Sequence, residues 1–157
     1  MILHLVGTLD KSMLDAVVDF LFQRAGERIT IRITSDGGDP DIALAIVGLL
    51  KSHGGNVKTE VYGQCYSAAV LIFAAGAQRR MSKYAWCMVH QASEEIEGSA
   101  DRIKQCAKQM ERDETHWNGI MQEFTGTDAK VWEKLNERDT YLNAEECRKL
   151  NLCTEIF

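Results

Sequence analysis

The sequence predicts an α/β fold in a single domain that spans residues 1–157. Short apolar runs rich in β-branched residues alternate along the chain with stretches whose apolar residues recur at helical spacing. Strands that alternate with helices favour parallel pairing, because a helix carries the chain back to the start of the next strand. The chain contains no internal repeat, low-complexity stretch or linker, and 157 residues suffice for one hydrophobic core.

The first two predicted elements are a strand and a one-sided helix. Residues 1–6 form a short apolar run that is typical of a strand, and Gly7 closes it. Asp10 or Ser12 is the candidate N-cap of the helix that follows. Five apolar residues recur at the spacing of one helix face: Leu14, Val17, Val18, Leu21 and Phe22.

A second strand and helix follow. Residues 28–33 alternate apolar and polar side chains and contain several β-branched residues, which indicates a strand. Residues 36–40 read Asp-Gly-Gly-Asp-Pro and predict a turn, in which Asp39 is the N-cap and Pro40 the first helical residue. The buried face of this helix is predicted to consist of Ile42, Ala45, Ile46, Leu49 and Leu50.

The remaining elements surround the most informative part of the chain. Residues 57–62 predict a strand, Gly63 a turn, and the small and apolar residues after Ser67 a helix that is buried on most sides. Residues 85–89 predict a strand that ends at His90. Further elements are predicted as follows: a long polar helix over residues 99–124 ended by Gly126, helices from Asp128 and from Asn143 with Glu146 as its capping-box partner, and a last strand over residues 152–157.

Composition excludes several classes of function. The net charge is −5 and basic residues do not gather on one stripe, so we expect no nucleic-acid partner. No apolar run approaches the ~20 residues of a membrane span, and no signal segment opens the chain, so we expect a cytoplasmic protein without membrane contact. Five cysteines without a Cys-x-x-Cys pair indicate reduced thiols and no metal site. The absence of a phosphate-binding motif leaves nucleotide binding unsupported, and we expect no cofactor.

Ser67 is a hydroxyl at the first turn of a helix that is otherwise apolar, and such a position needs a physical reason. One interpretation is helix capping. The other is a nucleophile whose developing oxyanion would be stabilised by the amides at the helix N-terminus. Cys65 is a rival nucleophile, but a thiol in apolar surroundings is usually inert, and we favour the serine.

Three other positions could complete a catalytic site. His90 is a candidate general base because it ends an apolar strand, although a hydrogen-bonded structural histidine fits the same pattern. Asp139 lies in a charged turn, where it could orient a histidine or simply be a solvated or capping carboxylate paired with Arg138. Gly37 and Gly38 allow backbone amides to approach a ligand closely, which suits an oxyanion hole or a phosphate. The order Ser, His, Asp differs from those of α/β-hydrolases, chymotrypsin and subtilisin.

Four motifs in one order resemble those of the proteolytic subunit of Clp protease, the caseinolytic serine peptidase, and the match covers nearly the whole chain. Residues 33–38 (Ile-Thr-Ser-Asp-Gly-Gly) resemble the family's Ile-Asn-Ser-Pro-Gly-Gly, and residues 63–69 (Gly-Gln-Cys-Tyr-Ser-Ala-Ala) resemble its Gly-Gln-Ala-Ala-Ser-Met-Gly. Residues 88–91 (Met-Val-His-Gln) are similar to its Met-Ile-His-Gln. Residues 137–146 are similar to the stretch that contains its catalytic aspartate.

The resemblance implies a fold and a mechanism. The fold would be a spiral of ββα units, as in crotonases. The function would be a serine endopeptidase that cleaves peptides or unfolded proteins inside an oligomeric ring chamber. By position, Ser67 would be the nucleophile, His90 the general base and Asp139 the residue that orients the imidazole. The amides of Gly38 and Ala68 would form the oxyanion hole.

The resemblance also implies partners and shows departures. It implies heptameric rings that stack into a tetradecamer through the helix of residues 99–124, with an AAA+ unfoldase as a further partner. Asp36 replaces a proline, Ala69 replaces a glycine, and the segment before His90 is about two residues shorter than usual. Met1 falls at the family's first core strand, so we expect a minimal, phage-type form without the axial segment, a wide entrance and little stimulation by an unfoldase.

Two alternatives remain open at this point. A crotonase-type acyl-thioester enzyme would present a similar pair of amides to a thioester oxyanion, but it would have no use for a Ser-His-Asp set. A catalytically silent ring subunit would keep the family sequence without its chemistry. The peptidase is favoured because serine, histidine and aspartate occupy all three triad positions.

Overall fold

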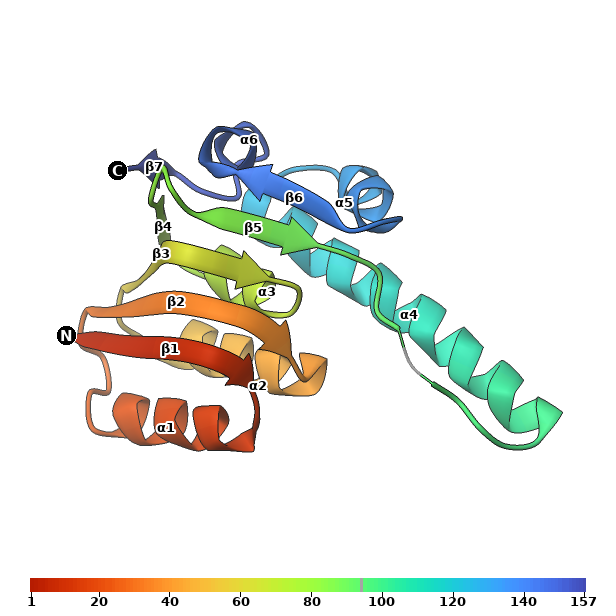
Figure 1. The fold of residues 1–157 in the computed structure, drawn as a ribbon. Coiled ribbons are helices and arrows are strands. Elements are labelled where there is room, and N and C mark those ends of the chain that lie inside the picture. The colour runs from red at the N-terminus through yellow and green to blue at the C-terminus, as the bar shows by residue number, and fades with distance from the viewer. Residues whose placement is uncertain (94) are drawn as a thin grey trace.

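One mostly parallel sheet organises the chain in the computed structural model, which describes residues 1–93 and 95–157 (Figure 1). Its main path runs β1-β2-β3-β4-β7, with β5 added beside β3 and β6 beside β5. Every pairing is parallel except that of β5 with β6. The strands are β1 (Ile2–Leu9), β2 (Ile29–Gly38), β3 (Val57–Tyr66), β4 (Gln78–Met81), β5 (Trp86–Val89), β6 (Thr140–Asn143) and β7 (Glu155–Ile156). The predicted α/β class is confirmed.

Six described helices accompany the sheet, and most of their predicted ends are confirmed. They are α1 (Lys11–Phe22), α2 (Pro40–Ser52), α3 (Ala69–Ala74), α4 (Ala100–Thr125), α5 (Ala129–Asn136) and α6 (Ala144–Lys149). The side chain of Asp10 caps α1, and that of Asp39 caps α2, which begins at Pro40. Asn143 and Glu146 form the predicted capping box of α6. Side chains that accept the first amides of a helix explain why these boundaries are readable from sequence.

The first three strands run further than predicted, because glycines continue them instead of ending them. Gly7 adopts a φ of +90° at a register shift, and β1 continues to Leu9. Residues 36–38, predicted as a turn, belong to β2, where Gly37 and Gly38 pair with β1. Likewise β3 continues past Gly63 to Tyr66. Each extension adds residues at the strand end that leads to the Ser67 region.

The strand β3 forks the sheet. Its first half, Lys58–Val61, pairs with β4, and its second half, Gln64–Tyr66, pairs with β5. Neither β4 nor β6 was predicted from sequence. The sequence of β4 (Gln-Arg-Arg-Met) is polar, and charged residues precede β6, so neither segment has the apolar pattern of a strand. Both strands form because they pair with segments distant in the chain. The short β7 at the end of the chain pairs with β4.

The helices α1, α2 and α3 cover one face of the sheet, and the core lies between them (Figure 1). In β2 buried residues alternate strictly with half-buried or exposed ones, as one covered face requires. In α1 the buried stripe is narrower than predicted: Val17 and Leu21 are buried, whereas Val18 and Phe22 are exposed. The segment α3 is buried along its whole length, as predicted.

The long helix α4 begins after its cap Ser99 and ends at Gly126, which has a φ of +75°. Its 26 residues correspond to about 39 Å. Residues 100–109 are exposed except for half-buried Cys106, and this part projects away from the sheet (Figure 1). The C-terminal part packs against α3 and α5.

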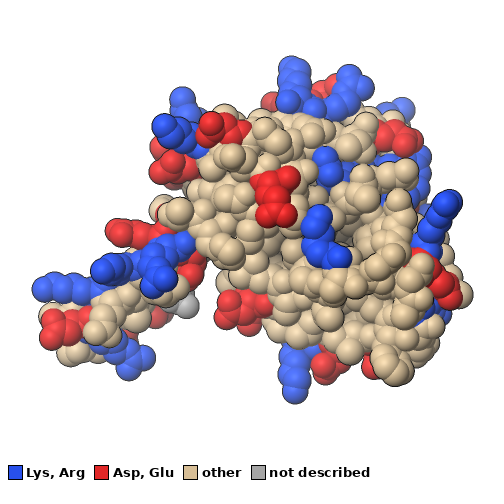
Figure 2. All heavy atoms as spheres, turned by 180° about the vertical axis from the view of Figure 1, so that it is seen from behind, with Lys and Arg blue, Asp and Glu red and all other residues tan. Residues whose placement is uncertain are grey.

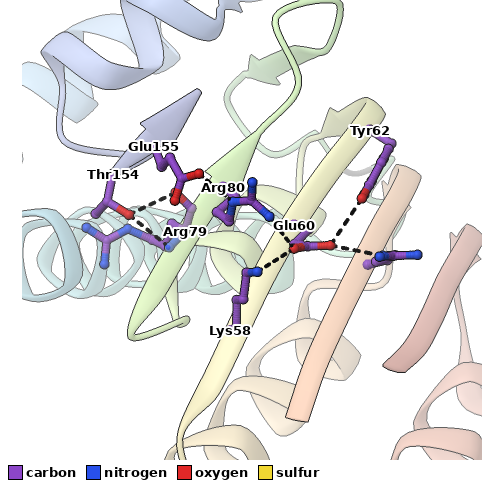
Figure 3. Close-up of polar contacts among 8 residues, drawn as sticks. Lys58, Glu60, Tyr62, Arg79, Arg80, Thr154 and Glu155 are labelled. Atoms are coloured by element: carbon purple, nitrogen blue, oxygen red, sulfur yellow. Dashed lines mark hydrogen bonds and ion pairs between the residues drawn. The ribbon is translucent and has the colours of Figure 1, made fainter. Parts of the chain in front are cut away.

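The outer face of the sheet carries an ionic cluster centred on Glu60, in β3 (Figure 3). The carboxylate of Glu60 lies 2.7 Å from Lys58 Nζ, 2.9 Å from Arg32 Nε and 3.1 Å from Arg80 Nη1. The Tyr62 hydroxyl donates to the same carboxylate at 3.3 Å. These side chains cover Glu60 so well that its exposed fraction is 3 %.

Charges of both signs are scattered over the face seen in Figure 2, and the projecting part of the molecule carries both. No single basic surface is visible in that view. Within residues 1–93 and 95–157, no helix is long and apolar enough to cross a membrane.

Candidate active site

Ser67 occupies the turn between β3 and α3 with a φ of +53°, in the left-handed region that non-glycine residues seldom adopt. The Ser67 amide donates to the carbonyl of Met88 at 2.7 Å, which ties this turn to β5. Strain of this kind costs about 1–3 kcal/mol and concentrates at functional sites. The capping interpretation of Ser67 is wrong, because Ala68 occupies the N-cap position of α3 and no side chain caps that helix.

The Ser67 hydroxyl contacts His90 instead. The distance between Ser67 Oγ and His90 Nε2 is 2.7 Å, which is hydrogen-bonding distance. Register explains the meeting: Tyr66 in β3 pairs with Met88 in β5, and both strands end at the same edge. The histidine predicted from the end of an apolar strand is therefore brought together with the predicted nucleophile.

Asp139 lies near the other imidazole nitrogen. Its Oδ1 is 3.8 Å from His90 Nδ1, beyond hydrogen-bonding distance, and its side chain is 67 % exposed. His90 directly follows β5, and Asp139 directly precedes β6. The antiparallel pairing of Val89 with Thr140 therefore places the two residues side by side. The carboxylate does not cap α6, a role that belongs to Asn143. The three predicted residues thus lie together at one sheet edge. Ser67 and His90 are within hydrogen-bonding distance, and His90 and Asp139 are not.

Of the glycine pair at the end of β2, Gly37 lies directly against this turn and Gly38 against β1. A Cβ atom on Gly37 would stand 2.8 Å from the Ser67 Cβ and 2.8 Å from the Tyr66 carbonyl. Gly37 and Gly38 have φ values of +95° and +139°, so both the space and the backbone exclude a side chain. The hydroxyl of buried Ser35, which sequence reasoning did not single out, accepts the Gly37 amide at 3.1 Å.

A cleft of about 350 Å³ opens beside these residues. Its wall includes Gly38, Ser67, Ala68 and His90, so the positions predicted for the oxyanion hole and the nucleophile share one cavity. The helix α4, the start of α2, the end of β5 with the segment after it, and Asn136 of α5 also line this cleft. Sequence reasoning missed this contribution of α4. The only available signal was the helical spacing of Met110 and Trp117 within a polar helix.

Four of the five cysteines are buried, and no cysteine is among the described residues that line the cleft. Cys65 is completely buried and pairs in register with Cys87, so its sulfur has no access to a substrate. Contact with Cys87, together with burial, raises the pKa of Cys147, and burial raises the pKa of Cys153 to about 11. Thiols held in their protonated form are poor nucleophiles. Ser67 is therefore the accessible nucleophile at this edge.

Comparison with known proteins gives two findings. The family model described as Clp protease matches residues 1–157. The ATP-dependent Clp protease proteolytic subunit 2 of Treponema denticola is 33 % identical over 161 aligned positions, which cover 97 % of this chain and 79 % of that protein.

Proposed function

This chain belongs to the Clp protease family, and from that membership we propose that it is a serine endopeptidase acting through Ser67, His90 and Asp139. The observation that carries the proposal is the 2.7 Å distance between Ser67 Oγ and His90 Nε2 in a cleft wall. A nucleophile within hydrogen-bonding reach of its base is the geometric signature of covalent catalysis.

The chemistry follows from these positions. His90 Nε2 takes the hydroxyl proton as Ser67 Oγ attacks the carbonyl carbon of the scissile bond. The amides of Gly38 and Ala68 stabilise the oxyanion that results. His90 then gives its proton to the leaving amine, and the C–N bond breaks to leave an acyl group on Ser67. Water, deprotonated by His90, hydrolyses that ester and restores the hydroxyl.

Asp139 acts as the residue that orients His90. Closing the 3.8 Å gap to a hydrogen bond requires a movement of about 1 Å. The exposed carboxylate has room for that movement. Catalytic hydrogen bonds are often long without substrate and shorten in the reactive complex, so we propose that the Asp139 contact closes when a substrate is bound.

Members of this family assemble into rings of their own subunits. For this chain we propose a ring of seven copies, stacked in pairs through the projecting part of α4. Support comes from large side chains that one subunit leaves exposed, such as Trp86 at 44 % and Tyr141 at 52 %. Native mass spectrometry checks the number of copies, and a monomer at all concentrations tested contradicts this assembly.

A fluorophosphonate probe tests the chemistry, because it labels only serines that an adjacent base activates. We expect labelling at Ser67 that the Ser67→Ala variant abolishes, together with hydrolysis of short peptides by the wild type. Absence of labelling in an assembled ring favours the catalytically silent subunit. Peptide hydrolysis that survives Ser67→Ala contradicts the assignment of the nucleophile, and hydrolysis of an acyl thioester but of no peptide favours the crotonase-type enzyme.

A further inference from the structure

Among the described residues around the cleft, the ionic side chains other than histidine all carry one sign of charge. This part of the wall contains the carboxylates of Asp41, Asp113 and Glu114, and no lysine or arginine. Across residues 1–93 and 95–157, none of the three lies within 4.0 Å of a lysine or arginine nitrogen. Asp113 Oδ1 accepts a hydrogen bond from the neutral amide of Gln109 at 2.7 Å, which leaves its charge in place. The three charges are therefore available to a ligand, unlike that of Glu60.

The same cleft also has apolar walls. Leu44 faces it from α2, and Met110 and Trp117 face it from α4. All three are half-buried. Met110, Glu114 and Trp117 recur at the spacing of one helix face, so an apolar wall and a carboxylate are presented side by side. A pocket of this composition fits a side chain with a long apolar stem and a cationic end.

Building on the peptidase activity proposed above, we propose that this cleft selects peptide segments with lysine or arginine beside the scissile bond. The methylene stem packs on Leu44, Met110 and Trp117, and the cation meets the carboxylates of Asp41, Asp113 or Glu114. The ring of Trp117 adds attraction for a cation. A glutamate in the same place is repelled by three like charges, so the cleft discriminates against acidic segments.

The test uses peptides that differ only beside the scissile bond, with lysine, norleucine or glutamate on its N-terminal side in one set and on its C-terminal side in another. Norleucine matches the lysine stem without its charge. For at least one set we expect kcat/KM for lysine to exceed that for norleucine by about fivefold, as partly exposed charge pairs allow. The advantage should shrink as salt is raised from 0.05 to 0.5 M.

The variant Asp41→Asn/Asp113→Asn/Glu114→Gln should bring the ratio of lysine to norleucine close to one, and Glu114→Gln alone should lower it in part. The control Glu123→Gln makes the same change on α4 outside the cleft and should keep the wild-type ratio. Equal use of lysine and norleucine by the wild type overturns the inference. So does an unchanged preference in the triple variant.

Binding to the Ser67→Ala variant separates this inference from the proposed function. Fluorescence anisotropy with the same peptides should show lysine binding tighter than norleucine, and norleucine tighter than glutamate. That order in binding, without hydrolysis by the wild type, contradicts the peptidase proposal and leaves the selectivity standing. Hydrolysis without that order overturns the selectivity and leaves the peptidase. Failure to bind or hydrolyse any of the peptides overturns both.

Discussion

Two polar clusters on the strand β3 and the turn after it are built in opposite ways. Around Glu60, three cations and a tyrosine hydroxyl fill the capacity of one buried carboxylate (Figure 3). At Ser67 the backbone is strained, and the hydroxyl lies within hydrogen-bonding distance of His90. The distance between His90 and Asp139 is too long for a hydrogen bond. The difference teaches where chemistry can occur. A polar group whose hydrogen bonds and ion pairs are all formed stabilises the fold. A group that can still form further hydrogen bonds can bind a substrate and react.

Protonation equilibria express the same contrast. Burial alone would raise the pKa of Glu60, but the hydrogen bonds of Lys58 and Arg32 and the charges beside them lower it to about 2. The carboxylate therefore stays charged in the folded protein over most of the pH range. A carboxylate held in this way is fixed in one ionisation state and is unsuited to proton transfer near neutral pH.

The largest expected effect is a loss of activity without a loss of stability at Ser67. Ser67→Ala should lower kcat for peptide hydrolysis by about 10⁴- to 10⁶-fold, because the members of a triad act as a unit. Its thermal midpoint should stay within a few degrees of the wild type, since the hydroxyl makes no contact that the core requires. Peptidase assays and thermal unfolding at one protein concentration check both. A loss of stability comparable to the loss of activity would break the comparison.

The next effect concerns the open contact. Asp139→Ala should lower kcat by about 10²-fold, or roughly 3 kcal/mol, which is far less than the loss expected for His90→Ala. The reason is that the Asp139 side chain is 67 % exposed, so solvent screens its interaction with His90 even when the contact has closed. Steady-state kinetics of the two variants decide the point. Equal losses would show that Asp139 is as tightly engaged during turnover as the histidine.

Glu60→Gln should affect stability and spare the chemistry. We expect the free energy of unfolding to fall by about 2 kcal/mol, below the usual value for a buried pair because Lys58, Arg32 and Arg80 stay partly exposed. The pKa of Glu60 is depressed, so its contribution is present above about pH 4.5 and is lost as pH falls toward 2. Denaturant titrations over this pH range should show a decline in the wild type that is weaker in Glu60→Gln. Parallel curves would contradict this assignment.

The smallest effect tests the rival nucleophile. Cys65→Ser should leave kcat within about threefold of the wild type, because the thiol is completely buried and has no path to the cleft. Labelling of the variant by the fluorophosphonate should be unchanged. Abolished hydrolysis in a folded Cys65→Ser ring would move the chemistry from the hydroxyl to the thiol.

Local signals in the sequence predicted the helices well and the strands less well. Caps such as Asp10, Asp39 and Asn143 act within one turn of the chain, so their partners are visible in the sequence. The fork of β3 is not visible in the sequence. The strands β4 and β5 pair with different halves of β3, and these pairings arise only when the chain folds. The strand β6 was read as part of a charged turn for the same reason.

The candidate site shows the same division. The setting of Ser67 and of the glycine pair gave local reasons to single them out, since a lone hydroxyl and bare amides are unusual there. Asp139 offered no such reason. Its local context fits a solvated carboxylate, and only the resemblance to a family assigned it a role. Antiparallel pairing of β5 with β6 is what brings it to His90, and that pairing joins residues about 50 positions apart.

The distance along the chain between the site residues has a consequence for the order of synthesis. Ser67 and Asp139 are separated by 139 − 67 = 72 residues. A ribosome adds about 5–20 residues per second, so a growing chain carries Ser67 for roughly 4–14 s before Asp139 is made. The strand β7, which closes the sheet beside β4, is made later still. A nascent chain therefore lacks the full set of catalytic groups until Asp139 has been added.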